Sequence, residues 1–417
     1  MTMPLQGSLV IVAEHPTELA GALSALGFAI IETNVVDAPA AIEAGKPAAI
    51  ILADSQAAND LPLAKMLTQK VTAAAPIIPV LARLPLDGAL AYREALPVAL
   101  DAPVSILAAR LSAVLRVRTL HGAVLRRAEA AKSDGRPLPP ASTNDPLDDA
   151  TVIVAGRARS YPALAVAIGE RVGLIGALSI ETAAQYLKAR DVDGLVVGDG
   201  FSLQNLRALL TVLAEDSTFR DLPIAILNGG AVTLDYDLPG LVQHSDPTLL
   251  VAHVMPYVRL HAFEMQLKRI LASLDAEGML DPDTGLLHPD AFARDLEGAI
   301  RGARERGTGL SIARLVFEPH LAPRASADTA RLVSRLVRQV DFGCREDDGS
   351  VLIVFTETDL RHAHVIARRI AGTLKDTMLQ LNRQQPMAPG VTLGTLKSSD
   401  TMTSLLARVS APAIAAE

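Results

Sequence analysis

The residues from 338 to 358 read Arg-Gln-Val-Asp-Phe-Gly-Cys-Arg-Glu-Asp-Asp-Gly-Ser-Val-Leu-Ile-Val-Phe-Thr-Glu-Thr. The stretch opens with an Arg-x-x-Asp pair, Arg338 and Asp341. An acidic segment with one glycine follows at 347–350, and an unbroken apolar run begins directly after it, at Val351. A polar, glycine-containing turn in front of an apolar run predicts a β-hairpin. The other inferences about the C-terminal part of the chain start from this hairpin.

This order resembles the central hairpin of a GGDEF (diguanylate cyclase) domain. In that family an Arg-x-x-Asp motif precedes the catalytic signature Tyr-Gly-Gly-Asp/Glu-Glu-Phe and an apolar strand. The Arg-x-x-Asp is intact here, but the signature is not. The residues at the signature's place are Asp347, Asp348, Gly349 and Ser350. The resemblance therefore implies a regulatory nucleotide site that is kept and a catalytic site that is lost, as expected of a receptor rather than an enzyme.

Cyclase chemistry needs two metal ions that activate one GTP hydroxyl and clamp the other triphosphate. The family places a metal-binding carboxylate at the end of the strand that precedes the hairpin. Here that place reads Val316-Phe317-Glu318, and the metal position falls on Val316, which has no lone pair for a hard cation. The second metal acid of the family becomes Ser350. The segment 319–327, which supplies substrate contacts in the family, is shortened and has a different sequence here. The family's phosphate-contacting Lys is missing after residue 395. We therefore expect no catalysis and no bound metal.

The retained residues correspond to the family's inhibitory site, where cyclic di-GMP binds. Arg369 aligns with a second Arg that the family uses there. A guanidinium can bond to guanine O6 and N7 or meet a phosphate, and a carboxylate can accept from the guanine N1–H and N2 edge. We therefore expect Arg338, Asp341 and Arg369 to bind cyclic di-GMP, with no other cofactor. The alternative is that Arg338 and Asp341 form an ordinary exposed ion pair worth about 0.2–0.5 kcal/mol.

A second motif supports the same resemblance. The segment from 281 to 292 is similar to the opening motif of GGDEF domains, Asp-x-Leu-Thr-Gly-Leu-x-Asn-Arg-Arg-x-Phe. The matching residues are Asp281, Thr284, Gly285, Leu286 and Phe292. The Asn and the two Arg of the motif are replaced by His288, Pro289 and Asp290. A helix from 292 to 306 and a strand from 311 to 317 are expected to follow.

The N-terminal part of the chain alternates short apolar runs with helical segments. Strands are expected at 9–13, 29–32, 49–52, 77–81 and 98–100, and continuous apolar strands between helices indicate a parallel sheet covered on both faces. The pattern repeats at 151–155, 194–197 and 222–227, an offset of roughly 142 to 145 residues. Two (βα)5 units of flavodoxin-like type are therefore expected, joined by a flexible linker at 133–150.

These units resemble the receiver domains of response regulators. A working receiver needs an acidic pair, a phosphoacceptor Asp and a Lys, because phosphoryl transfer depends on placed charges. The phosphoacceptor positions fall on Ala53 and Gly198, each one residue before an acid, Asp54 and Asp199. Neither unit has the Lys, so neither is expected to accept phosphate. If the alignment is shifted by one residue, Asp54 becomes a candidate; otherwise both acids are expected to cap the segments that follow them.

The second unit ends in a helix with a regular apolar seam. Its members are Leu260, Phe263, Leu267, Ile270 and Leu274. The alternating spacing of three and four predicts a coiled coil about two heptads long. A signalling helix or a homodimer contact is expected here, and the alternative is a helix that packs on its own domain. Pro256 is expected to kink or start this helix.

Composition restricts the class of protein. The chain has 417 residues and a net charge of −7 without a basic run, which disfavours nucleic-acid binding. Cys344 is the single cysteine, so no internal disulfide is possible and a reducing compartment is expected. No secretory signal and no run of about 18 apolar residues is visible, so a cytoplasmic protein without membrane insertion is expected.

The whole chain resembles the GGDEF response regulators with two receiver domains, the PleD/PopA-like group. The predicted divisions are receiver-like 1–118, a helix extension and linker 119–150, receiver-like 151–258, a signalling helix 259–277 and a degenerate GGDEF domain 278–417. The resemblance implies a bacterial α/β signalling protein that binds cyclic di-GMP and acts through dimerisation or a protein partner. A residual cyclase and an adaptor that binds no nucleotide are the alternatives.

Overall fold

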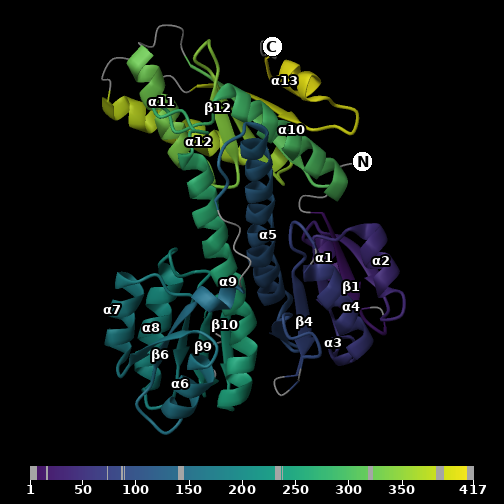
Figure 1. The fold of residues 1–417 in the computed structure, drawn as a ribbon, viewed down its shortest axis with the longest axis vertical. Helices are drawn as coiled ribbons and strands as arrows, with labels where there is room; N and C mark the ends of the chain where they lie inside the picture. The colour runs from purple at the N-terminus through teal and green to yellow at the C-terminus, as the bar shows by residue number, and fades with distance from the viewer. Residues whose placement is uncertain are drawn as a thin grey trace.

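The computed structural model describes residues 7–15, 17–72, 74–85, 88, 90–139, 145–230, 236, 238–317, 323–381 and 389–410. These residues form an α/β protein with three sheets, two parallel and one antiparallel. Figure 1 shows the two parallel-sheet units side by side at one end of the molecule and the antiparallel unit at the other end. Two long helices connect the two ends.

The first unit has the strand order β2-β1-β3-β4-β5, which is the flavodoxin-like order 2-1-3-4-5. The strand expected at 77–81 begins instead at Val80. The reason is that Pro79 has no N–H for the ladder, while Ile77 donates its N–H to Nδ1 of His121, 3.1 Å away on the last helix of the unit. The elements are β1 (Ser8–Val12), α1 (Glu18–Ala25), β2 (Ala29–Thr33), α2 (Ala38–Gly45), β3 (Ala49–Leu52), α3 (Ser55–Asn59), α4 (Leu61–Thr72), β4 (Val80–Leu84), β5 (Leu96–Ala99) and α5 (Val104–Ser133).

The second unit repeats this architecture. Its sheet has the order β10-β9-β8-β6-β7, which read from β7 is again 2-1-3-4-5. Strands β8 and β9 are buried along their whole length, as strands of a sheet covered on both faces must be. The elements are the 3₁₀ turn η1 (Pro146–Asp149), β6 (Thr151–Ala155), α6 (Tyr161–Gly169), β7 (Gly173–Ala177), α7 (Ile180–Ala189), β8 (Gly194–Val197), α8 (Leu203–Glu215), β9 (Ile224–Leu227), β10 (Leu241–His244) and α9 (Pro247–Ala276).

The third unit is an antiparallel sheet in the order β12-β13-β11-β14. Side chains alternate between its two faces. Leu352 and Val354 face a core shared with α5, α9 and α10, while Ile353 and Phe355 face a core shared with α11 and α12. The elements are α10 (Pro289–Arg306), β11 (Leu310–Val316), α11 (Pro323–Leu336), β12 (Phe342–Arg345), β13 (Val351–Thr356), α12 (Leu360–Leu381), β14 (Gly390–Thr395) and α13 (Met402–Ser410).

Helices α5 and α9 form the axis of the molecule. Each is 30 residues long and closes one parallel-sheet unit before continuing to the antiparallel unit (Figure 1). Their first halves, including Leu111 and Val254, lie in one core with strands of both parallel sheets. Their second halves, including Val124 and Leu271, lie in the core of the antiparallel unit. The three units therefore share continuous apolar cores.

The apolar seam of α9 has its partner within the same chain. Leu267 and Leu274 are buried in one cluster with Val117 and Leu120 of α5. The interpretation of this seam as a contact between two copies is therefore wrong for these side chains, because α5 already covers them. The helix also does not start at Pro256: it begins at Pro247, and Pro256 lies inside it. A homodimer through another surface stays a prediction.

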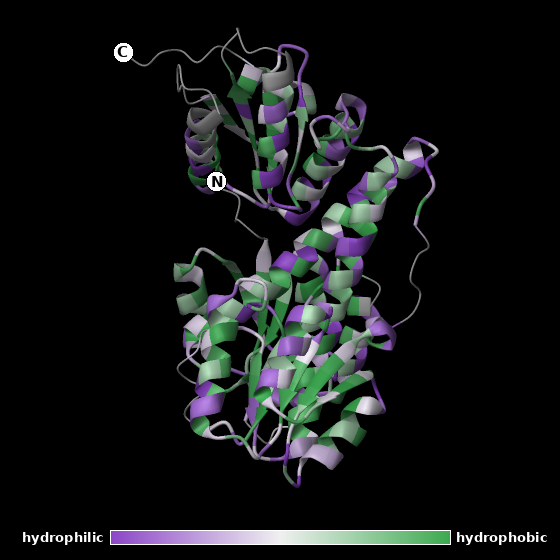
Figure 2. Cartoon of the chain, turned by 90° about the vertical axis from the view of Figure 1, so that its left-hand side faces the viewer, coloured by the Kyte–Doolittle hydropathy of each residue, from purple (hydrophilic) through white to green (hydrophobic). Residues whose placement is uncertain are grey.

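Hydropathy follows this arrangement. Figure 2 shows the apolar colours concentrated in the strands and the polar colours on the outward sides of the helices. Among the residues that the structure describes, no helix is long and apolar enough to cross a membrane.

Buried charges join α5 to its neighbours. The guanidinium of Arg127 contacts the carboxylates of Asp275 on α9 and Asp295 on α10, the latter at 3.2 Å. Arg126 approaches the other oxygen of Asp295 at 3.1 Å. Asp295 is 1% exposed, and a buried ion pair that loses one partner leaves an uncompensated charge out of water. The position of α5 against α10 therefore depends on this carboxylate.

Replacing Asp295 by Ala is expected to destabilise the protein by about 3–5 kcal/mol, because Arg126 and Arg127 then stay buried without their shared partner. The matched control is Glu129→Ala, which removes a second α5–α10 pair, with Arg301, whose side chains are 61% and 58% exposed. That control is expected to change the free energy of unfolding by about 0–1 kcal/mol. Urea unfolding followed by circular dichroism measures both, and equal effects would contradict this role of Asp295.

Candidate functional site

Arg338 and Asp341 lie in the short connection between α11 and β12. The N–H of Asp341 donates to the carbonyl of Arg338 at 3.0 Å, which closes a turn. The two side chains differ in environment: Arg338 is exposed, whereas Asp341 is only 6% exposed. The alternative of a solvent-exposed Arg338–Asp341 ion pair is therefore wrong, because the carboxylate is inside the protein.

The carboxylate of Asp341 is anchored at one oxygen and unused at the other. Thr356, at the end of β13, donates to Oδ1 from its N–H at 2.9 Å and from its hydroxyl at 3.2 Å. Oδ2 has no hydrogen-bond partner among the described residues. Burial raises the pKa of Asp341 to about 6, although the N–H of Thr356 and the charges of Arg338 and Arg126 act in the opposite direction. An ionised carboxylate accepts several hydrogen bonds, so Oδ2 of Asp341 could accept hydrogen bonds beyond those that Thr356 donates to Oδ1.

Arg369 lies on α12, the helix that packs beside α11. Its side chain is exposed, like that of its neighbour Arg368. Arg126, whose charge acts on Asp341, lies on α5, whereas Arg369 lies on α12. The structure thus brings Arg338 next to Asp341 and places Arg369 on an adjacent helix, without closing the three into one pocket.

The turn between β12 and β13 has the hairpin geometry that its glycine predicts. Gly349 has φ +82°, and its N–H donates to the carbonyl of Glu346 at 2.9 Å. Only glycine adopts this left-handed conformation without strain. Asp347 and Asp348 are exposed at the tip, and Ser350 is buried below them. The positions of the catalytic signature are thus occupied by a tight acidic turn.

A single arginine holds the acids of this turn. Arg314 on β11 contacts Oε2 of Glu346 from Nε at 2.9 Å and Oδ2 of Asp348 from Nη2 at 2.5 Å. The hydroxyl of Ser350 lies 2.8 Å from Glu346 and 2.6 Å from Asp348. Ser350, together with Arg314, holds the pKa of Asp348 below its ordinary value. Arg314 thus places one positive charge between two carboxylates, and Asp347 beside them is exposed.

The carboxylate expected of a cyclase at the end of β11 is absent. Val316 is the last residue of β11, paired with Gly390 of β14, and Glu318 lies outside the described residues. Arg314 lies two residues before Val316 and therefore on the same face of the strand. The sequence reasoning missed Arg314 and Glu346. The signal was available, since a charged residue at this point of an apolar strand requires a partner.

The phosphoacceptor position of the first parallel-sheet unit falls on Ala53, which is buried. Asp54 is the N-cap of α3: its Oδ1 accepts the N–H of Ala57 at 2.8 Å, and its Oδ2 accepts the N–H of Glu14 at 2.9 Å. Both oxygens are therefore used in structural hydrogen bonds, as an N-cap requires.

The corresponding position of the second unit, Gly198, directly follows β8. Asp199 accepts a hydrogen bond from the hydroxyl of Ser160, and the cap of α8 is instead Ser202. The expectation that Asp199 caps the next helix is wrong, because Ser202 lies closer to the helix start. Over the described ranges, no three His, Cys, Asp or Glu side chains form a group that could hold a metal ion.

Asp341 is expected to make stability depend on pH. Its pKa rises from 3.8 in the unfolded chain to about 6 in the folded protein. The stability it contributes is therefore full below the unfolded pKa and is lost as pH rises through about 6. In Asp341→Asn the amide oxygen still accepts from Thr356, so this loss should disappear, and the variant should be more stable at neutral pH by about 1–3 kcal/mol. Urea unfolding from acidic to neutral pH tests this, and parallel profiles would contradict the raised pKa.

Comparisons with known proteins assign no family. No protein-family model matches the chain, and no curated protein sequence matches it. Among solved structures, the coiled coil and GGDEF domain of DgcB from Caulobacter crescentus, in complex with c-di-GMP, is 20% identical over 35% of this chain and 83% of its own, with a TM-score of 0.28. A segment of PelD from Pseudomonas aeruginosa PA14, in its apo form, is 14% identical over 37% of this chain and 50% of its own, with a TM-score of 0.23. A phosphoglycerate oxidoreductase from Vibrio cholerae is 14% identical over 64% of this chain and 99% of its own, with a TM-score of 0.17. TM-scores this low do not define a shared fold.

Proposed function

We propose that this protein is a non-catalytic receptor for cyclic di-GMP that binds its ligand at Arg338, Asp341 and Arg369. The observation that carries the proposal is the carboxylate of Asp341, which is buried next to Arg338 and has one oxygen without a hydrogen-bond partner. A buried acceptor of this kind needs an explanation. A guanine edge carries the matching donors, and it reaches this buried oxygen when the atoms that cover it move aside.

The chemistry of the ligand fits the charges available. Cyclic di-GMP presents guanine O6 and N7 acceptors, N1–H and N2 donors, and two phosphates. Arg338 and Arg369 are exposed, so their guanidinium groups can reach a guanine or a phosphate bidentately. Asp341 accepts from the N1–H and N2 edge through Oδ2 while Oδ1 stays on Thr356. This assignment gives each retained residue a different part of the ligand.

The proposed lack of cyclase activity rests on the turn after β12. A metal-dependent cyclase needs free carboxylates near the end of β11. Val316 offers none there, and Glu346 and Asp348 are held by Arg314. Arg314 lies among these acids and offsets part of their negative charge. The protein therefore binds nucleotide without turning it over.

The proposed route of the signal runs through α5. Thr356 holds Asp341 and is followed by Glu357, whose carboxylate contacts Thr119 and lies 3.7 Å from Nη1 of Arg118. A ligand on Asp341 thus acts one residue away from a contact with α5, which reaches both parallel-sheet units. We propose that these units, as receiver-like modules of a bacterial cytoplasmic response regulator, pass the state on through dimerisation or a protein partner.

Titration calorimetry with cyclic di-GMP is expected to show binding by the full chain. Arg338→Ala should weaken it by about 1–3 kcal/mol, roughly tenfold to a hundredfold. Asp341→Asn keeps the bond to Thr356 but presents a donor to the guanine edge, so it should also weaken binding. Arg159→Ala, an exposed arginine on the second unit, is the control for charge alone and should bind normally. No heat with the wild type would favour an adaptor that binds no nucleotide.

Incubation with GTP and Mg²⁺ or Mn²⁺ is expected to yield no cyclic di-GMP, because the position of the metal carboxylate is Val316. Chromatography of the reaction products measures this directly. The single variant Arg314→Ala, which frees Glu346 and Asp348, should stay inactive because Val316 still lacks a carboxylate. Metal-dependent product from the wild type would overturn the assignment in favour of a residual cyclase.

A further inference from the structure

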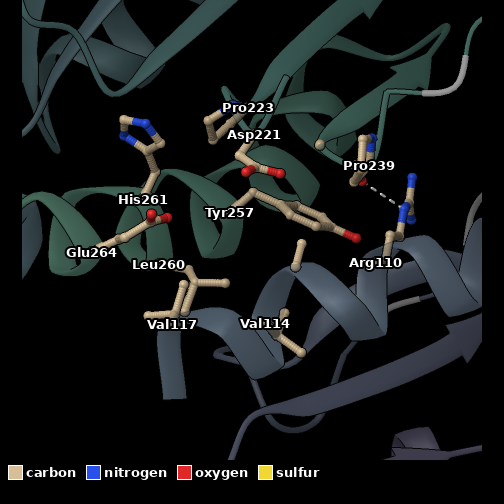
Figure 3. Close-up of a pocket in the computed structure, with 12 residues that line it drawn as sticks. Arg110, Val114, Val117, Asp221, Pro223, Pro239, Tyr257, Leu260, His261 and Glu264 are labelled. Carbon is tan, nitrogen blue, oxygen red and sulfur yellow. Dashed lines mark hydrogen bonds between the residues drawn. The ribbon is translucent and has the colours of Figure 1, made fainter. Parts of the chain in front are cut away.

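Arg110 on α5 is a buried cation without an acidic partner. It is 9% exposed, and its Nε, Nη1 and Nη2 donate to the carbonyls of Pro239, Pro97 and Leu241 at 2.9, 2.7 and 2.7 Å. Its guanidinium carbon lies 5.3 Å from the centre of the Tyr257 ring, as Figure 3 illustrates. Among the described residues it takes part in no ion pair, although buried charges are usually paired.

One role of Arg110 is structural. Pro97 lies on β5 and Leu241 on β10, which are edge strands of the two parallel sheets. Arg110 therefore joins two sheet edges whose carbonyls have no strand partner on that side. These bonds use three of the five N–H groups of a guanidinium, and the hydroxyl of Tyr257 takes a further hydrogen bond from Arg110. They do not neutralise its charge.

A cavity of about 290 Å³ adjoins this guanidinium. It lies beside the edge strands β5 of the first unit and β10 of the second, and Leu84 at the end of β4 also lines it. Its lining is mostly apolar, with Val98, Ile106, Ala109, Leu238 and Val242 among the lining residues. The cavity has room for a small molecule with an apolar body.

The other polar groups of the cavity do not cancel the charge of Arg110. Nε2 of His244 lies 3.0 Å from Nδ1 of His253, whose own Nε2 lies 3.3 Å from the carbonyl of Gly88. Because a carbonyl only accepts, His253 carries its proton on Nε2, and His244 donates to its Nδ1. Burial lowers the pKa of His253, so it is neutral at pH 7. Asp101 also lines the cavity, and its charge acts on Arg83.

We propose that this cavity binds a small organic acid, with the apolar body against the aliphatic lining and the carboxylate against the unpaired positive charge of Arg110. The ligand would touch β5 of one unit and β10 of the other. It would therefore stabilise the arrangement of the two parallel-sheet units. This site is separate from the one proposed for cyclic di-GMP, and its occupation does not depend on that function.

The probes are benzoate and hexanoate, each compared with its uncharged amide, benzamide and hexanamide. Thermal unfolding and titration calorimetry of the full chain should show binding of an acid at millimolar concentration and at least about tenfold weaker binding of the amide, as expected when a charge-assisted bond is lost. Absence of binding by both acids, or equal binding of acid and amide, would overturn the proposal.

Two variants locate the site. Arg110→Gln should remove the preference for the acid, while Arg116→Gln, on the exposed side of the same helix and paired with Asp221, should keep it. Ala109→Leu fills the cavity without touching Arg110 and should abolish binding of the acid even if Arg110→Gln fails to fold. Cyclic di-GMP binding should be unchanged in Ala109→Leu. Unchanged benzoate affinity in Ala109→Leu would show that the acid binds elsewhere and would refute the site.

Discussion

Burial of the arginines of α5 is the constraint on which the arrangement of the three units depends. Arg110 ties the edges of the two parallel sheets, Arg118 reaches Glu357 of the antiparallel unit, and Arg127 joins α9 and α10. A guanidinium out of water is stabilised by hydrogen bonds or by an opposite charge. Arg110 has three backbone carbonyls and no acid, whereas Arg118 and Arg127 lie beside carboxylates. Each unit contributes groups that contact these arginines. The three units are therefore held together by more than the chain segments that connect them. The apolar cores alone would allow α5 and α9 to slide or rotate, whereas planar guanidinium bonds fix one register.

The carboxylates at the two ends of the β12–β13 hairpin differ in how completely they are hydrogen-bonded. At the turn, Arg314 and Ser350 make hydrogen bonds to Glu346 and Asp348. At the base, Asp341 keeps an oxygen without a partner in a place where burial raises its pKa. A satisfied cluster gains little from a ligand, while an unused buried acceptor gains a full hydrogen bond. The physical asymmetry of the hairpin is thus the reason for assigning nucleotide binding to its base and no chemistry to its turn.

Much of the fold follows from local patterns in the sequence, and the site follows only in part. Runs such as 49–52 and 151–155 could be placed because a buried parallel strand needs unbroken aliphatic residues, and Gly349 because a tight turn needs positive φ. Contacts between segments that are far apart in the sequence have no local pattern from which they could be predicted. The seam of α9 reads the same whether α5 or a second copy covers it. The burial of Asp341, the contacts of Arg314 with two carboxylates and the link from Arg127 to Asp295 depend on tertiary partners, which one sequence does not reveal.

The residue that follows the proposed ligand site offers a physical means of coupling. Glu357 has φ +50°, a backbone conformation that costs a non-glycine residue on the order of 1–3 kcal/mol unless its surroundings hold it. The surroundings are Thr119 and Arg118 of α5 and, at 3.9 Å, Arg306 of α10. In the proposed complex a ligand on Oδ2 of Asp341 would alter the charge on Oδ1, which accepts from Thr356, and so would act on the peptide next to Glu357. The ligand can shift the position of α5 only by as much free energy as its binding differs between the two positions of that helix. That strain and a typical coupling free energy of about 1–3 kcal/mol are of the same order, so under the proposed function Glu357 is the expected point of coupling between the ligand site and α5.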